Sequence, residues 1–435
     1  MKKAAASDSL LRREIGKIGV ATIAMNGVIG SGIFALPAIA IAQTGYFSPW
    51  VFVLCGLLIL SVALTLARTA GFFDITGGPV AYTTHAFGRY VGCQTGLLIY
   101  VSRVAAIAAS ANLIVSYAAA LWEPLASGSP KIAAIIGYIS LATMLNVVGV
   151  RAGMAMVYLI SILKLLPLLL LIFVGLPTIE WVGVIGTDIP GTETLGQSML
   201  VLMYAFIGFE FSLIAAGETR NARKAIPRTL VGTVVAISFC YALIQLVVVS
   251  VGSDLGKSDA PLVEVAGRLM GPAGALALGL GVVFSVGGGS LTSLLTAPRL
   301  TFALSRDGSL PAWFGKVSEK SHVPVNSILF CGLFSMTLAV SEGFVWLVTL
   351  STLVRLLSYA LCIASLPNIE KTIPAEEGQF RLRGGLAIPG IGFLLTLWLI
   401  SHSTIQHFLI AGLIVILGSI IFFASSLSRK GSMDN

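Results

Sequence analysis

The chain has 435 residues, of which 56% are hydrophobic and 11% are charged, with a net charge of +8. This composition excludes a water-soluble globular protein, because such proteins carry about 25% charged residues. Basic and aromatic residues do not interleave as they do in nucleic-acid-binding surfaces, so we expect no nucleic-acid partner. Apolar stretches near the roughly 20 residues that cross a bilayer as a helix recur throughout, which makes the lipid bilayer the expected surroundings.

We predict an all-α membrane protein with about 12 transmembrane helices. The predicted spans are 17–44, 48–70, 91–121, 131–149, 152–176, 195–217, 229–252, 273–303, 325–341, 343–366, 386–403 and 405–427. Together they form one polytopic domain over residues 17–427, with a polar tail at each end (1–16 and 428–435). The first tail has no small-residue cleavage signal, so we expect it to be kept.

The placement of the positive charges predicts the orientation of the chain. When the 27 Lys and Arg residues are assigned to alternate loops, 21 fall on one side, three within spans, and three on the other side (Lys131, Lys257 and Arg268). Because the Lys- and Arg-rich side of a membrane protein faces the cytoplasm, we predict a multi-pass protein of the cytoplasmic membrane with both termini inside. The same asymmetry favours an even number of helices.

Several classes of site are not indicated by the sequence. The five cysteines lie singly in apolar segments, without the spacing of a metal site or a disulfide framework. Membrane enzymes cluster His, Asp, Glu or Ser/Lys pairs at one membrane level, and channels repeat a filter motif; neither pattern is visible, and no nucleotide-binding loop is present. We therefore expect no catalytic residue, no metal and no cofactor.

The first predicted span contains Gly27, Gly30 and Gly32, and Ser31 lies between the last two. Each interior glycine costs a helix about 1 kcal/mol relative to alanine. In a bilayer an interrupted backbone persists only where it is buried or lines a cavity. The run predicts a broken helix, although closely spaced glycines can also serve as a packing face between helices.

The sixth span contains Gly208 followed by Glu210, the only acidic residue well inside a span. Interrupted helices at matching places in two repeats are typical of the substrate site of secondary transporters. Helix-start amides in the first span would attract a carboxylate, and freed carbonyls in the sixth would accept from an ammonium group. Such a site fits an amino acid zwitterion.

These segments resemble those of the amino acid–polyamine–organocation (APC) transporters. The resemblance rests on Gly30-Ser31-Gly32-Ile33-Phe34, on Phe206-Ile207-Gly208-Phe209-Glu210 and on loop motifs at 77–88, 217–228 and 305–311. It implies a five-plus-five inverted repeat of the leucine-transporter type, with broken helices 1 and 6 and alternating access. The repeats would cover 17–176 and 195–366, and two extra helices would cover 386–427.

The resemblance also implies a substrate site. The carboxylate would meet the amides of Ser31 and Gly32 beside Gly30, and the ammonium group would meet the carbonyls of Val28, Tyr204 and Ile207. Tyr204 could lie over the substrate or pack against other side chains. The same two alternatives apply to Phe206, which lies two residues before Gly208. Side-chain specificity stays open, with Ser102, Ser293 and Thr352 as polar contributors to consider.

Four charged residues lie inside predicted spans, where a charge costs about 3 kcal/mol on insertion scales. For Glu210 we expect a gating or proton-linked role, the alternative being a purely structural one. Lys164 lies roughly 18 Å into its span and resembles the fifth-helix lysine of some proton-coupled family members, where it stands in for sodium. Gly27 and Ser285 would be its neighbours. The roles of Arg103 and Arg355 stay open between an electropositive cavity and structural pairing.

We therefore predict a secondary transporter of amino acids that uses protons and not sodium. An amino acid/amine exchanger and a polyamine antiporter are alternatives, and a polytopic membrane enzyme is a remote one. A cationic substrate would call for several acidic residues at the site, and the spans offer only Glu210. The sequence leaves open which amino acid is carried, whether transport is symport or exchange, and what the oligomeric state is.

Overall fold

The fold was obtained as a computed structural model, which describes residues 15–73, 78–119, 122–148, 154–214, 216, 219–319, 322–374, 379, 380, 382 and 384–431. Most of the predicted first tail, the last residues of the second tail and part of the loop motif at 217–228 lie outside these residues. The described part of the chain is helical, and its β-structure is limited to one isolated parallel bridge between Ile15 and Thr219. The predicted all-α class is confirmed.

The helices keep the order of the predicted spans. They are α2 (Lys17–Val28), α3 (Ser31–Thr44), α4 (Ser48–Ala70), α5 (Pro79–Phe87), α6 (Arg89–Ala119), α7 (Gly128–Val148), α8 (Met154–Gly175), α9 (Trp181–Ile185), α10 (Thr192–Leu202), α11 (Phe211–Ile214), α12 (Ala222–Val251), α13 (Pro261–Arg306), α14 (Val325–Ser341), α15 (Phe344–Thr372), α16 (Ala387–Ser401) and α17 (Ile405–Gly431). Short 3₁₀ segments include η4 (Met203–Phe206) between α10 and α11.

Most predicted boundaries agree with the structure within a few residues, and the larger differences have local causes. Helix α12 begins seven residues before the predicted span, since Pro227 is tolerated within its second turn. Helix α13 begins at Pro261 because a short amphipathic segment precedes the span, and Gly271 (φ 68°, ψ −165°) separates the two parts. Among the described residues, eight helical segments are long and apolar enough to cross a membrane, and α14 and α16 are shorter apolar helices.

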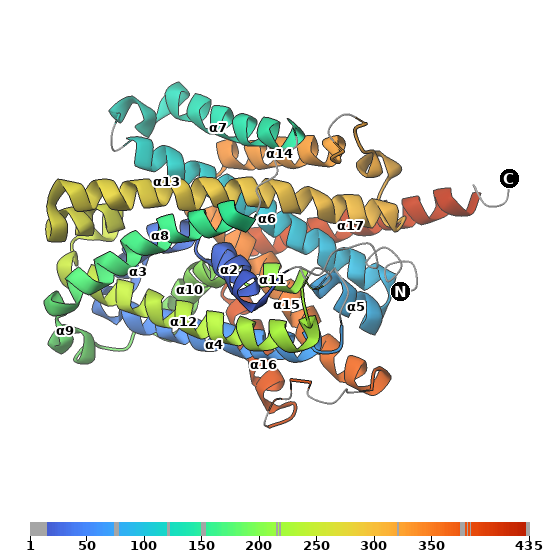
Figure 1. Ribbon diagram of the computed structural model, residues 1–435, viewed down its shortest axis with the longest axis horizontal. Coiled ribbons are helices and arrows are strands. Elements are labelled where there is room, and N and C mark those ends of the chain that lie inside the picture. Colours follow the sequence, from blue (N-terminus) through green and yellow to red (C-terminus); the bar gives the residue numbers. More distant parts are fainter. Residues whose placement is uncertain are drawn as a thin grey trace.

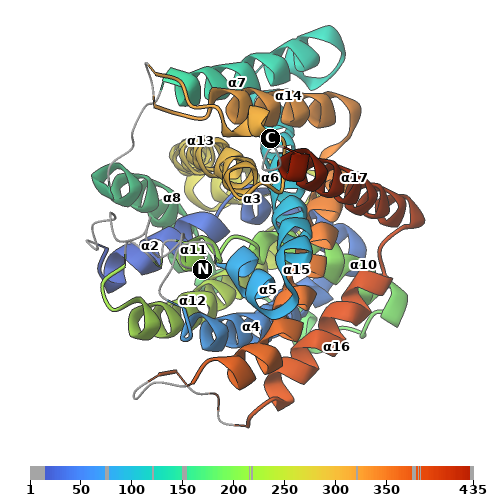
Figure 2. The same cartoon turned by 90° about the vertical axis from the view of Figure 1, so that its right-hand side faces the viewer.

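Figures 1 and 2 show a bundle with two flanks. Helices α4 and α12 pack side by side on one flank, and α7 and α14 pack on the opposite flank. The short helices α2 and α11 lie between these flanks, and α13 runs along the whole bundle. The arrangement surrounds the ends of the short helices with long ones.

Burial separates central helices from peripheral ones. Of the most apolar 18-residue stretch of each helix, 89% is buried inside the protein in α6 and 83% in α15, whereas only 11% is buried in α17. An apolar helix that is exposed nearly all round has lipid as its surroundings in a membrane protein. Helices α6 and α15 therefore belong to the interior of the bundle, whereas α2 packs chiefly on α12, α8 and α11.

Candidate functional site

The first transmembrane segment is broken where the glycines predict. Helix α2 ends at Val28 and α3 begins at Ser31, and the residues between them are extended (Ile29 ψ 91°; Gly30 φ −133°, ψ −146°). The first amides of a helix have no partner within it, and no side chain caps the start of α3. These amides present a positive dipole end to the interior, which suits an anionic group.

The second break also lies at its predicted place. Helix α10 ends at Leu202, η4 covers the next four residues, and α11 begins at Phe211. Ile207 is extended (ψ 140°), and Gly208 has φ +123°, a value that residues with a Cβ rarely adopt. The interruption of both helices is therefore confirmed.

The two breaks touch each other through their backbones. A Cβ added to Gly208 would lie 2.1 Å from the Gly27 oxygen, and one added to Gly32 would lie 2.6 Å from the Ala205 Cα. A side chain at either glycine would push the backbones of the two broken helices apart. The glycines are thus required by close approach as well as by conformation, and they hold the start of α3 against η4.

Space remains beside the uncapped amides. A Cβ built on Gly30 would meet no atom within 4 Å. On the adjoining wall, the Ser31 Oγ and the Tyr204 hydroxyl are hydrogen-bonded at 2.9 Å, and the Ser110 Oγ donates to the Ser31 Oγ at 3.2 Å. Tyr204 therefore lies over the start of α3.

Lys164 bonds to the backbone at the first break. Its side chain is 1% exposed, and its Nζ donates to the carbonyls of Ile29 (2.7 Å) and Asn26 (3.2 Å) at the end of α2. The Ser285 Oγ from α13 donates to the same Ile29 carbonyl at 3.2 Å. The ammonium group joins α8 to the freed carbonyls of α2, and Ser285 joins α13 to them, so the structure brings these predicted residues together. Gly27 lies within the same turn.

Glu210 pairs with Arg355 inside the protein. The two side chains are 1% and 2% exposed, and Arg355 Nη1 lies 2.8 Å from Glu210 Oε1. The other carboxylate oxygen accepts from the Tyr359 hydroxyl at 2.8 Å and from the Gly208 amide at 3.1 Å. The carboxylate thus connects the second break to α15, and Arg355 extends the connection to α6 by donating from Nε to the Ser102 Oγ at 3.1 Å.

Arg103 lies near this pair but has different contacts. Its Nη1 donates to the Thr296 Oγ1 at 2.6 Å, and its guanidinium lies 4.1 Å from the centroid of the Phe211 ring. The structure places it between α6, α11 and α13. The two intramembrane arginines are therefore unequal, because Arg355 has a carboxylate partner and Arg103 has a hydroxyl and an aromatic face.

The sequence of the chain matches a family model described as "Amino acid permease" over residues 15–429. The chain belongs to this amino acid permease family. It is similar to the branched-chain amino acid permease BcaP of Bacillus subtilis (25% identical, covering 99% of this chain and 96% of BcaP) and to the gamma-aminobutyric acid permease of Escherichia coli (27%; 84% and 82%). It is also similar to the serine/threonine exchanger SteT of Bacillus subtilis (26%; 70% and 70%).

Family membership confirms the resemblance drawn from the motifs. It makes the chain a multi-pass integral membrane protein, and the named relatives are transporters, not enzymes, which agrees with the expectation of a permease. As a family of amino acid permeases, it also gives the substrate as a small molecule of that class.

Several residues at the permease's two breaks escaped the sequence analysis. The Tyr241 hydroxyl of α12 donates to the Val28 carbonyl at 3.2 Å, and Phe206 packs on that tyrosine with a ring-centroid distance of 5.3 Å. Asn26 bonds to Ser161 of α8. Polar side chains in mid-span were the available signal, but without a register they could not be assigned to one face.

Two of the three suggested polar contributors, Ser102 and Thr352, have hydroxyls that are hydrogen-bonded within the protein. Ser102 bonds to Ser351 (Oγ to O, 2.9 Å) besides Arg355. Thr352 donates to the Val348 carbonyl of its own helix, and the Ser293 carbonyl accepts a long bond from Thr296 (3.4 Å).

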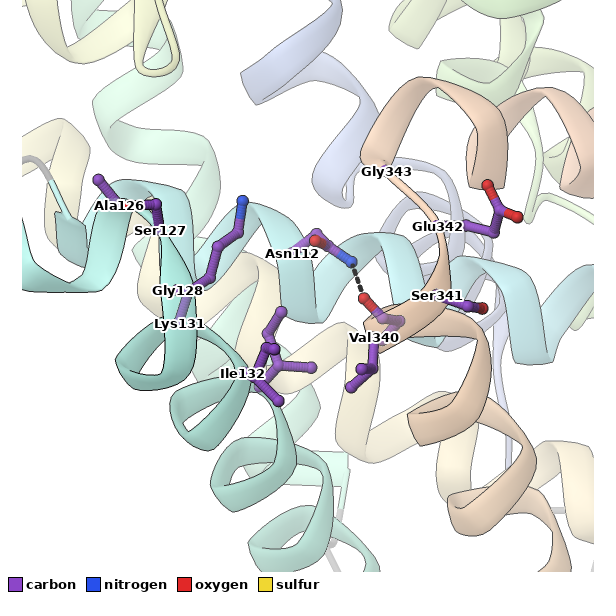
Figure 3. A pocket seen from close by; sticks show the side chains of 12 residues that line it. Asn112, Ala126, Ser127, Gly128, Lys131, Ile132, Val340, Ser341, Glu342 and Gly343 are labelled. Carbon is purple, nitrogen blue, oxygen red and sulfur yellow. Dashed lines mark hydrogen bonds between the residues drawn. The ribbon is translucent and has the colours of Figure 1, made fainter.

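A separate pocket of about 400 Å³ opens where the ends of α6, α7, α14 and α15 meet. Figure 3 shows Lys131 on one wall, Glu342 on the other and Asn112 between them. The Asn112 Nδ2 donates to the Ala339 carbonyl at 3.0 Å and so closes the floor of the pocket. Its lining includes none of the residues predicted to hold the substrate.

Proposed function

We propose that the protein is a secondary active transporter that moves amino acids across the cytoplasmic membrane by alternating access, coupled to protons and independent of sodium. Both termini would lie in the cytoplasm. The two repeats would cover residues 17–176 and 195–366, each beginning with a broken helix, and helices 386–427 would lie outside them. The matching places of the two breaks in the chain support this division.

The substrate would lie between the two breaks as a zwitterion. Its carboxylate would accept from the amides of Ser31 and Gly32, supported by the absence of a side-chain cap on α3 and the open space at Gly30. Its ammonium group would donate to the carbonyls of Val28, Tyr204 and Ile207. Because main-chain groups recognise the parts common to all α-amino acids, the side chain would be selected by the surrounding wall.

The observation that carries the coupling proposal is the position of Lys164. Its ammonium group sits among the carbonyl oxygens of Asn26 and Ile29, with the Ser285 hydroxyl beside them. Oxygen atoms converging on one point are also the ligands that hard cations such as sodium use. A fixed ammonium group there would remove the need for sodium. Release of the Lys164 proton would weaken its bonds to these two carbonyls and so loosen α2 from α8.

Glu210 would act as a gate residue. Its carboxylate holds the second break to α15 through Arg355 and Tyr359. For α11 to move relative to α15 during alternating access, these bonds must break or move as a unit. The pairing also argues against a polyamine antiporter, since the one intramembrane carboxylate of the spans already has a cationic partner.

Exchange is the second candidate mechanism. It is favoured by the similarity to the serine/threonine exchanger SteT, and the site described above would serve either mode. In an exchanger the unloaded carrier returns too slowly to sustain net uptake, so uptake would require an amino acid inside the vesicle.

The test uses purified protein in liposomes, screened with radiolabelled amino acids under imposed proton or sodium gradients. We expect uptake that an inward proton gradient drives and that sodium does not change. Lys164→Ala should abolish the response to the proton gradient, while the control Lys257→Ala, which removes an exposed lysine of η6 (Leu255–Lys257), should keep it. Uptake that needs sodium in the wild type, or an unchanged proton response in Lys164→Ala, would contradict the coupling proposal.

A further inference from the structure

The pocket at the ends of α6, α7, α14 and α15 carries opposite charges on opposite walls. Its volume of about 400 Å³ lies within the range of small-molecule sites, roughly 300–1,000 Å³. Lys131 on one wall and Glu342 on the other (Figure 3) are both partly buried, and neither forms an ion pair within the described residues. His407 of α17 lies near Glu342, but its ring nitrogens are hydrogen-bonded to Thr404 and to the Trp346 carbonyl. The pocket therefore separates one positive from one negative charge.

Each of these charges lies at the helix end that disfavours it. The start of a helix is its positive end and favours acidic residues, whereas its negative end favours basic ones. Lys131 lies in the first turn of α7, and Glu342 is the cap residue at the end of α14. One wall thus combines an ammonium group with a positive helix end, and the other combines a carboxylate with a negative one. The first wall suits an anionic group and the second a cationic group.

A buried side chain between the two walls has an unused acceptor. Asn112 of α6 is 7% exposed, and its Nδ2 donates to the carbonyls of Ala339 (3.0 Å) and Ala108 (3.2 Å). Its Oδ1 accepts no hydrogen bond from the described part of the chain, although the side chain lines the pocket. A buried acceptor without a partner costs free energy, and an ammonium group in the pocket would supply the missing donor.

We infer that this pocket binds a small zwitterion, with its anionic group at Lys131 and the start of α7 and its ammonium group at Glu342 and the Asn112 Oδ1. Hydrogen bonds between charged groups are roughly twice as strong as neutral ones. A free amino acid and the headgroup of a phosphatidylethanolamine lipid share the required chemistry, which is one anionic group and one primary ammonium group. The site is separate from the one between the two helix breaks. By the orientation proposed above it would open on the outer face, but binding there does not depend on that orientation.

The test is protection of a cysteine placed in the pocket wall. Ser341 lines the pocket and is exposed, so Ser341→Cys in the detergent-purified full chain should react with N-ethylmaleimide, and the unsubstituted chain gives the background from the five native cysteines. A zwitterion at about ten times its Kd should slow labelling about tenfold, because the unbound fraction falls by 1 + [L]/Kd. The probes are L-alanine, γ-aminobutyrate and glycerophosphoethanolamine. Protection by either amino acid assigns the site to free amino acids, and protection by glycerophosphoethanolamine alone assigns it to the lipid headgroup.

Charge variants locate the response. Lys131→Met and Glu342→Gln, each combined with Ser341→Cys, should raise the half-protecting concentration at least about tenfold, since each removes a hydrogen bond to a charged group. Lys257→Met, which removes an exposed lysine outside the pocket, should leave protection unchanged.

Because labelling reads this wall and not transport, failure of this site and failure of the proposed transport function would be seen separately. Three results would overturn the assignment. The first is no slowing by any of the three zwitterions, and the second is equal slowing by acetate or methylammonium, which carry only one charge. The third is protection that both charge variants leave intact.

Discussion

The buried pair of Glu210 and Arg355 allows a quantitative prediction. Replacement of Glu210 by Gln removes the charge opposite Arg355 Nη1 and leaves that guanidinium with its bond to Ser102. Loss of one partner of a buried ion pair costs roughly 3–5 kcal/mol, because the remaining charge stays desolvated. With an unfolding entropy of about 2.1 cal/mol/K per residue, this cost lowers the Tm of the chain by about 3–5 °C.

The assay is thermal unfolding in detergent, followed by loss of the monodisperse peak in size-exclusion chromatography. Glu193→Gln is the matched control, because Glu193 lies in the exposed first turn of α10 and its carboxylate accepts a hydrogen bond from Gln197 of the same helix. Its Tm should stay within about 1 °C of the wild type. The double variant Glu210→Gln with Arg355→Met should be more stable than Glu210→Gln alone, since no unpaired charge remains. Equal Tm values for Glu210→Gln and Glu193→Gln, or strictly additive effects in the double variant, would refute the reasoning.

Two further predictions concern the breaks. Gly208→Ala should abolish uptake, because the added Cβ would lie 2.1 Å from the Gly27 oxygen, at a residue whose φ is +123°. The control Gly279→Ala, whose added Cβ would have no atom within 4 Å, should transport normally. Normal uptake by Gly208→Ala would mean that the two backbones do not approach so closely. Tyr241→Phe should lower apparent substrate affinity by about fivefold, since it removes the hydrogen bond, worth about 1 kcal/mol, that holds the Val28 carbonyl in place. An unchanged KM in uptake assays would separate Tyr241 from the site.

The lengths of the hydrophobic segments and the placement of the glycines were sufficient to predict most helix boundaries and the two helix breaks. The breaks at Gly30 and Gly208 follow from local rules, because glycine weakens a helix and a bilayer tolerates interruption only inside the protein. Lys164 could be linked to the first break only through its resemblance to the fifth-helix lysine of family members, because its depth in the span indicates that it needs oxygen partners but not which ones.

Partners across helices could not be predicted in the same way. The pairing of Glu210 with Arg355 rather than Arg103 depends on how α6, α11 and α15 are rotated about their axes. Such rotation is set by side-chain packing, and an evenly apolar helix has no polar face that reveals it. The bond from Tyr241 to Val28 escaped prediction for the same reason.

The most direct test of the central claim is competition for uptake by blocked forms of the transported amino acid. If main-chain amides of α3 hold the carboxylate and freed carbonyls hold the ammonium group, both the methyl ester and the N-acetyl derivative should compete at least about 100-fold more weakly than the free zwitterion, because each leaves buried polar groups unpaired. Competition by either derivative at the strength of the free amino acid would contradict a site built from the two helix breaks.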